Sequence, residues 1–221
     1  MTTQQKRFLY SGNILKHIIV AVCLAIFLIL LSVTVVTYSK WFYAIQIDHL
    51  DIKTVTNMNK EEIEHHYNTV IDYLYPLHEK ELVLPTLPMS TEGKIHFEDV
   101  RNIFMKILLA LLIFGILSLF GSIWLVRKKQ PLFLLYTAIW VIFIPILLGA
   151  FIILYGFENS FNLFHELSFS NDYWVFDPQT DPIIYLLPIQ FFMYAFMAIL
   201  GLISIGSIVC FQLYFYMIKK G

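Results

Sequence analysis

The sequence has 221 residues, of which 58% are hydrophobic and only 14% are charged, and its formal net charge is −1. Soluble domains carry about 25% charged residues, so this composition excludes a soluble globular protein and predicts a membrane protein. The near-zero net charge, with no basic cluster larger than Arg127, Lys128 and Lys129, argues against nucleic acid as a partner.

Four apolar segments follow one another along the chain, and each is long enough to cross a hydrocarbon core, which takes about 20 helical residues. The sequence therefore predicts an all-α membrane protein with four transmembrane helices and an extracytoplasmic cap. The predicted order is a cytoplasmic N-terminus (1–16), a first span (17–37), the cap (38–102), a second span (103–126), a cytoplasmic loop (127–131), a third span (132–156), an extracytoplasmic loop with an interfacial segment (157–188), a fourth span (189–217) and a cytoplasmic C-terminus (218–221).

The distribution of charge predicts the orientation, because Lys and Arg are retained in short loops on the cytoplasmic side of a membrane. The segments before the first span, between the second and third spans, and after the fourth span carry basic residues and no acid. All 16 acidic residues lie between residues 48 and 99 or between 158 and 181. We therefore expect both termini in the cytoplasm and both acidic segments outside the cell membrane.

The cap is expected to contain an amphipathic helix and a short β-hairpin. Asn59 followed by Glu62 predicts a helix start, and an apolar stripe follows at helical spacing. Two short β-like runs, LVLP at 82–85 and KIHF at 94–97, flank the turn-rich PMSTEG and predict the hairpin. The stripe consists of Ile63, Tyr67, Val70, Ile71 and Leu74.

The second outer segment, 157–188, mixes acids and amides with aromatic residues. This mixture is typical of the membrane–water interface, and it also suits a pocket that receives an amphiphile. Pro188 predicts a break, so that residues 183–187 lie along the interface and the fourth crossing begins at residue 189.

Two of the seven histidines stand out by their local sequence. His96 precedes the second span and is followed three residues later by Asp99, which shares its face if the helix has begun and can then orient the imidazole. His165 lies just beyond the outer end of the third span. Both are expected on the same side of the membrane, so the pair can converge at one depth. The remaining histidines are expected in solvated or interfacial packing.

Three other kinds of chemistry have weaker support. A metal site built from His96, His165, Glu166 and an aspartate lacks the H-E-x-x-H spacing. A nucleophilic Ser168 or Ser170 lacks the G-x-S-x-G context. A transporter would place ionisable groups inside its spans, whereas these spans carry only Lys106, at the outer start of the second. We therefore predict no metal and no cofactor, and chemistry or binding at the outer interface.

The motifs HFEDVRNIF (96–104) and FHELSFSNDYWVFDPQTDPIIYLLP (164–188) resemble those of the lipoprotein intramolecular transacylases of Gram-positive bacteria. The resemblance covers the whole chain in topology and about 34 residues in motif. It implies a membrane enzyme whose substrate is a diacylglyceryl-modified lipoprotein with a free N-terminal cysteine. The enzyme moves the sn-2 acyl chain to the α-amino group of that cysteine, which gives the lyso form. Two histidines carry the chemistry in that family, and the matching positions here are His96 and His165.

The residues permit a mechanism without a covalent enzyme intermediate. One histidine acts as general base on the amine, and the other stabilises the oxyanion and protonates the leaving oxygen. His96, oriented by Asp99, is the favoured base, although the sequence leaves the assignment open. Asn171 and Asp172 are expected to position the backbone or a histidine. The expected pocket residues are Phe164, Phe169, Tyr173 and Trp174.

The alternative from another class is a non-enzymatic membrane module whose acidic cap binds a partner protein. It predicts that charge changes within residues 61–72 abolish function and that histidine changes do not.

Overall fold

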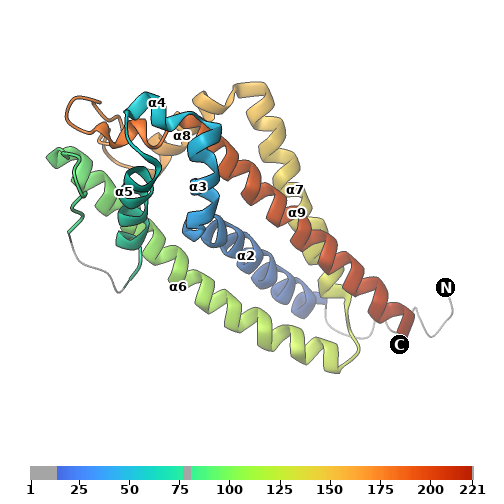
Figure 1. Ribbon diagram of the computed structural model, residues 1–221. Coiled ribbons are helices and arrows are strands. Elements are labelled where there is room, and N and C mark those ends of the chain that lie inside the picture. The colour runs from blue at the N-terminus through green and yellow to red at the C-terminus, as the bar shows by residue number, and fades with distance from the viewer. Residues whose placement is uncertain (1–13, 77–80, 221) are drawn as a thin grey trace. The chain divides into compact units, whose positions relative to one another are not determined.

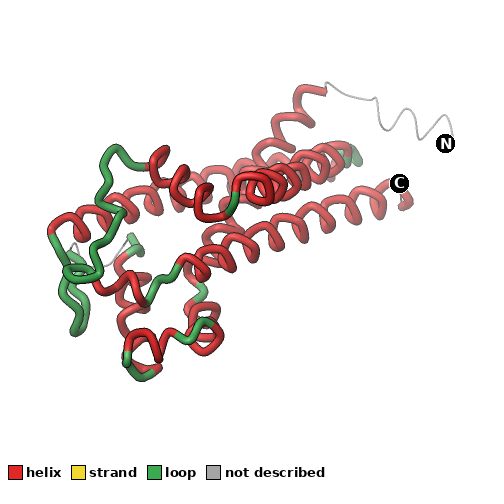
Figure 2. Tube along the Cα trace, turned by 90° about the horizontal axis from the view of Figure 1, so that it is seen from above, coloured by secondary structure: helices red, strands yellow, loops and turns green. Residues whose placement is uncertain are grey.

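The computed structural model describes residues 14–76 and 81–220, and every regular element in this part of the chain is a helix (Figures 1 and 2). The predicted N-terminal segment, 1–16, therefore lies almost entirely outside the described residues. The helices are α2 (Ile14–Tyr38), α3 (Lys40–His49), α4 (Ile52–Thr56), α5 (Lys60–Tyr73), α6 (Thr91–Arg127), α7 (Leu132–Tyr155), α8 (Phe157–Ser168), the 3₁₀ turn η1 (Pro182–Tyr185) and α9 (Ile189–Lys220).

Four helices, α2, α6, α7 and α9, are long and apolar enough to cross a membrane. The predicted fold class is therefore confirmed: the protein is an all-α integral membrane protein. Helix α6 is longer than the apolar run from residue 103 suggested, because it begins at Thr91 and includes part of the predicted cap. The chain divides into two compact units.

The first unit comprises residues 1–33, 108–150 and 198–221, and its described part holds segments of the four long helices. The side chain of Val20 in α2 packs directly on Gly121 of α6, where an added Cβ would lie 2.7 Å from a methyl carbon of Val20. Two hydroxyls donate across helix pairs, Thr137 to the Ala21 carbonyl at 3.3 Å and Ser207 to the Ala138 carbonyl at 2.8 Å. Small residues and hydroxyl hydrogen bonds are the usual means of helix association in lipid.

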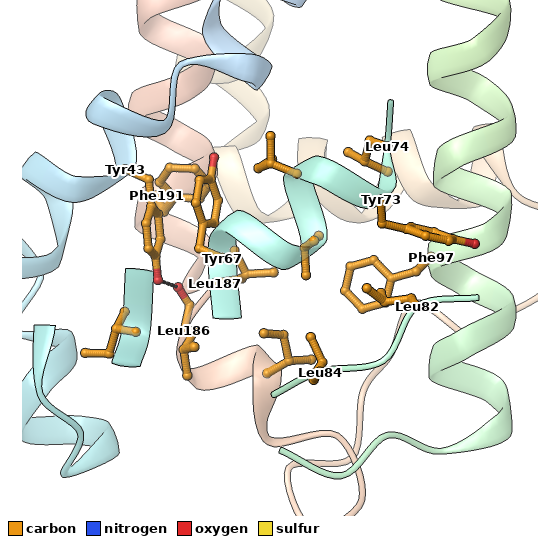
Figure 3. Packing of buried hydrophobic residues seen from close by; sticks show 14 of the residues in the cluster. Tyr43, Tyr67, Tyr73, Leu74, Leu82, Leu84, Phe97, Leu186, Leu187 and Phe191 are labelled. Atoms are coloured by element: carbon orange, nitrogen blue, oxygen red, sulfur yellow. Dashed lines mark hydrogen bonds between the residues drawn. The ribbon is translucent and has the colours of Figure 1, made fainter. Parts of the chain in front are cut away.

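The second unit comprises residues 34–107 and 151–197, and it has a core of its own. Tyr43 of α3 stacks on Tyr67 of α5 with ring centroids 3.7 Å apart, and Phe191 of α9 meets Tyr43 edge-on at 5.2 Å. The Tyr43 hydroxyl donates to the Leu186 carbonyl at 2.6 Å, as Figure 3 shows. This core packs α3, α5 and the segment after η1 against one another.

The amphipathic helix predicted in the cap is α5. Asn59 caps it, since its side chain accepts the backbone N–H of Glu62 at 2.8 Å. The predicted stripe is the buried face of the helix, with no member more than 5% exposed. Burial of one apolar face is what stabilises a helix of this length.

The predicted hairpin is wrong. Residues 94–97 lie inside α6, residues 82–85 are irregular, and no strand occurs in ranges 14–76 and 81–220. Ser90 starts the helix, because its Oγ accepts the backbone N–H of Gly93 at 2.9 Å. A capped start followed by a long helical run outweighs four residues of alternating pattern.

The second outer segment contains a helix, α8, that the sequence analysis did not predict. Gly156 joins α7 to α8 with a φ of +86°, a backbone conformation that side chains disfavour and glycine adopts freely. The chain can therefore change direction directly after the third long helix. After the loop 169–181 and η1, α9 begins at Ile189, immediately after Pro188.

Candidate active site

His96 lies near the start of α6, ahead of the apolar run that begins at residue 103. The imidazole is only 7% exposed. Its Nδ1 has no hydrogen-bond partner among the described residues. Buried polar atoms are normally paired, so His96 combines a fixed helical position with a nitrogen that is not used by the fold.

His165 lies on α8, and its Nδ1 is 2.7 Å from the backbone carbonyl oxygen of Phe161, one turn earlier. A carbonyl can only accept, so this bond assigns the proton to Nδ1. In the neutral ring, Nε2 then carries the lone pair. The helix therefore presents His165 with Nε2 ready to accept a proton.

The two imidazole rings lie close together, with centroids 6.2 Å apart and planes inclined by 35°. Phe169 packs against both rings, at 4.8 Å from His96 and 5.7 Å from His165. Phe176 lies 5.5 Å from His96, and Trp174 lies 4.8 Å from His165. All five residues belong to the second unit. The structure thus brings together the two histidines that the sequence singled out and surrounds them with aromatic rings.

These surroundings favour the neutral form of both rings. Burial, with a smaller effect of the neighbouring His165, lowers the pKa of His96 from 6.5 to about 4, against an opposing effect of the Asp99 carboxylate. Burial also lowers the pKa of His165, although the hydrogen bond to the Phe161 carbonyl opposes the shift. Loss of hydration disfavours an imidazolium ion, so at neutral pH both histidines are uncharged.

Asp99 lies one turn after His96 on α6, but it bonds to a different partner. Its Oδ2 accepts from Nδ2 of Asn171 at 3.1 Å, and no hydrogen bond joins it to the His96 ring within the described residues. The structure therefore does not support orientation of His96 by an Asp99 hydrogen bond. Asn171 also accepts the backbone N–H of Tyr173 at 3.2 Å, so it attaches the loop after α8 to α6.

The other predicted pocket residues are spread around the histidine pair. Phe164 lies 5.3 Å from the His165 ring and is 57% exposed. An open depression of about 640 Å³ is lined by Glu166, Phe169, Ser170, Asn171, Asp172 and Trp174. Tyr173 lines a separate cavity of about 240 Å³, between the start of α6 and residues 175–181. The depression and the histidine pair share Phe169 and Trp174, so a molecule in the depression lies next to the pair.

Three residues near the site had no individual role in the sequence analysis. The backbone carbonyl of Phe161 accepts the Nδ1 proton of His165. Phe161 lies four residues before His165 on a helix, and this spacing is the signal that could have identified the contact. Phe176 covers His96. Asp181 is a 2% exposed carboxylate that contacts the start of α6. Phe176 contacts His96 and Asp181 contacts Ser90, about 80 to 90 positions away along the chain, so no local sequence pattern predicts these contacts.

The family model described as lipoprotein intramolecular transacylase Lit matches residues 18–192, a range that includes both histidines. The chain belongs to the Lit family. It is therefore an acyltransferase, and the predicted family, fold and enzyme class are confirmed. The Lit family also implies a lipoprotein as the substrate, which makes the non-enzymatic module the weaker interpretation.

Solved structures of the membrane integral Lit from Bacillus cereus agree with this assignment. One has 46% sequence identity and a TM-score of 0.90, and the match covers 93% of this chain and 95% of that chain. Two others, each also 46% identical with a TM-score of 0.84, carry a histidine replaced by arginine or by alanine; they match 93% of this chain and 92% and 93% of their own. A comparison with curated proteins gave no match.

The pKa shifts of this Lit chain lead to a prediction about protonation. At pH 5.5 we expect His96 to remain neutral, because its pKa lies at about 4, whereas an unperturbed histidine would be mostly protonated. Nitrogen-15 NMR of histidine-labelled protein in detergent measures this, with His96→Gln as the assignment variant and the denatured chain as the reference. Since the folded pKa lies below the unfolded value, stability is complete above about pH 6.5 and declines as the pH falls towards 4. A His96 signal that titrates near 6.5 in the folded protein would contradict the prediction.

Proposed function

We propose that the chain transfers the sn-2 acyl chain of a diacylglyceryl-modified lipoprotein to the α-amino group of its N-terminal cysteine, which yields the lyso form. The observation that carries this proposal is the pair formed by His96 and His165, with ring centroids 6.2 Å apart inside an aromatic enclosure. Transfer of an acyl group from an ester to an amine needs a base, an oxyanion donor and a proton for the leaving oxygen, and two neutral histidines can supply all three.

His165 is the better candidate for the base. Its Nδ1 proton is held by the Phe161 carbonyl, so Nε2 presents the lone pair. The substrate amine has an ordinary pKa of about 7.7–8.0, so near neutral pH a fraction of it is already the free amine that can attack. As the amine attacks the ester carbon, His165 takes the N–H proton and then gives it to the departing glyceryl oxygen.

His96 is the better candidate for the oxyanion donor. With a pKa of about 4, it stays neutral and donates an N–H hydrogen bond without exchanging its proton. Neutral imidazole donors stabilise an oxyanion when they are fixed in a water-poor site. This assignment reverses the role that the sequence analysis favoured for His96.

No covalent enzyme intermediate is required, because the nucleophile and the ester belong to one substrate molecule. The C–N bond forms in the tetrahedral adduct, the C–O bond breaks when this adduct collapses, and the proton moves from the amine nitrogen to the departing glyceryl oxygen. Correct placement of the two ends can supply about 7–11 kcal/mol of the barrier reduction. The enclosure of the pair by Phe169, Phe176 and Trp174 favours such placement.

The proposed substrate is an amphiphile, and two surfaces near His165 match its two halves. Phe164 and Leu167 of α8 are 57% and 79% exposed and offer an apolar face to acyl chains. The depression beside the pair carries, next to Phe169 and Trp174, four polar side chains that suit the peptide following the cysteine: Glu166, Ser170, Asn171 and Asp172. We therefore place the reaction at the extracytoplasmic leaflet, with both termini in the cytoplasm, as the separation of basic and acidic segments favours.

A synthetic diacylglyceryl-cysteine peptide with different acyl chains at sn-1 and sn-2 tests the proposal. After incubation with the purified protein in detergent or vesicles, we expect fragmentation mass spectrometry to find the sn-2 chain on the α-amine and the sn-1 chain still on the glyceryl group. The matched control is the same peptide with an acetylated α-amine, which has no nucleophile and should remain unchanged. Transfer of the sn-1 chain, release of free fatty acid without amide formation, or unchanged free-amine peptide would overturn the proposal.

A further inference from the structure

Asp181 is a buried carboxylate that joins the loop 169–181 to the start of α6. It is only 2% exposed. Its Oδ1 accepts the backbone N–H of Ser90 at 2.8 Å, and its Oδ2 accepts the hydroxyl of Thr180 at 2.8 Å. A buried carboxylate is costly unless it is hydrogen-bonded, and here both oxygens are paired.

The helix leaves space for this carboxylate only because residue 93 is glycine. A Cβ added to Gly93 would lie 2.3 Å from Oδ1 of Asp181 and 3.0 Å from its Cγ. Both distances are far inside van der Waals contact, and the carboxylate is fixed by its hydrogen bonds to Ser90 and Thr180. Gly93 and Asp181 therefore fit each other sterically.

A second link joins the same loop to α6 further along the helix, where Asn171 donates to Asp99. Gly93 and Asp99 lie three residues before and three residues after His96, so all three share one helix face. Between the two links the loop carries Trp174 and Phe176. The two attachments thus span the stretch of loop whose rings cover the histidine pair.

We propose that Asp181 is a positioning residue that holds the loop 169–181 against the first turns of α6 and thereby fixes the separation of His96 and His165. Asp181 acts on the histidines indirectly, because it binds Ser90, lies against Gly93 and so holds the loop in place. The kinetic consequence rests on the transacylase mechanism proposed above, whereas the structural consequence does not. Misplacement by about 1 Å of groups that must react together can cost about 10²-fold in rate.

Four variants and one control test this. Asp181→Ala removes the link and should lower kcat by about 10²-fold with KM nearly unchanged. Asp181→Asn keeps the size and an acceptor for Ser90, so it should retain most activity. Gly93→Ala should be as defective as Asp181→Ala, and the double variant no worse than either single one, because alanine at 181 removes the clash. The control is Asp177→Asn, an exposed acid of the same loop whose carboxylate accepts only a local backbone N–H.

The protonation of His96 provides a readout that is independent of activity. Phe169 and Phe176 pack on His96, and the titratable groups near it are His165 and Asp99. If the loop detaches in Asp181→Ala, His96 gains water, its pKa moves from about 4 towards 6.5, and its NMR signal becomes that of an imidazolium at pH 5.5. A residue that contributed only to stability would lower the melting temperature and leave this signal unchanged well below that temperature.

The outcomes separate the two proposals. A shifted His96 signal in Asp181→Ala but not in Asp177→Asn supports the positioning role, even if the lipopeptide reaction is not the one proposed. An unshifted His96 signal in Asp181→Ala overturns the positioning role and leaves the proposed reaction untouched. A shifted signal with a wild-type kcat overturns the claim that the link matters for the rate. Additive losses in the double variant would also contradict it.

Discussion

Replacing His165 by alanine is expected to lower the rate of acyl transfer by about 10²–10⁴-fold, the usual contribution of general acid–base catalysis. His165→Gln should be equally inactive, because an amide cannot take the amine proton. The measurement is the initial rate of N-acyl product formation from the synthetic lipopeptide, followed by mass spectrometry. The reason for the large effect is that Nε2 is the atom left free by the bond from Nδ1 to the Phe161 carbonyl.

Variants of His96 test the role of oxyanion donor, and glutamine is expected to act differently there than at residue 165. His96→Ala removes the oxyanion donor and should also cost about 10²–10³-fold, but His96→Gln retains an N–H donor in a similar position and should recover part of that loss. The control is His65→Ala, which changes an exposed histidine on α5. If glutamine restored activity at residue 165 and not at residue 96, the two assignments would be reversed. If both alanine variants formed product at the wild-type rate, the two-histidine mechanism would be wrong.

Replacing Tyr43 by alanine is expected to destabilise the second unit by about 3–5 kcal/mol, the typical cost of removing a buried aromatic ring. Tyr43 is fully buried between Tyr67 and Phe191, and its hydroxyl donates to the Leu186 carbonyl. For a chain of this length, such a loss lowers the melting temperature by about 6–20 °C. Thermal unfolding in detergent, followed by intrinsic fluorescence, measures the shift.

Tyr43→Phe separates the ring from the hydroxyl. It keeps the stacking and removes only the donor to Leu186, so about 1–3 kcal/mol is expected. The control is Ile45→Ala on the same helix, where the side chain is 60% exposed and a small effect is expected. Equal melting temperatures for Tyr43→Ala and Ile45→Ala would show that the α3 contacts do not stabilise this unit.

Local patterns in the sequence predicted the helical elements well. Asn59, Glu62 and the apolar stripe of α5 were identified because capping and periodicity depend on residues within two turns. The four long helices were identified because a membrane demands about 20 apolar residues in succession. The hairpin at 82–97 was wrong, since four alternating residues are too few to outweigh a capped helix. Helix α8 was missed because its acids and aromatic residues were attributed to an interfacial loop.

The candidate site was only partly predictable for a different reason. His96 and His165 were found from their motifs and a family resemblance, and the structure places their rings near each other. The partner of Asp99 was not found, because Asn171 lies 72 positions away along the chain. The fit of Asp181 against Gly93 was not found either, since it depends on a missing side chain and on packing between distant segments.

The hydrogen bond between His165 and the Phe161 carbonyl has a consequence for how mutation can affect the enzyme. In many histidine-dependent enzymes a carboxylate orients the imidazole, and a single substitution can delete it. Here the acceptor is a main-chain atom, which every amino acid at position 161 possesses. The proposed base therefore depends on the helicity of α8 rather than on the identity of a partner side chain. The secondary structure therefore sets the tautomer of His165. We expect this tautomer to persist when residue 161 is substituted, and to be lost when a proline breaks α8.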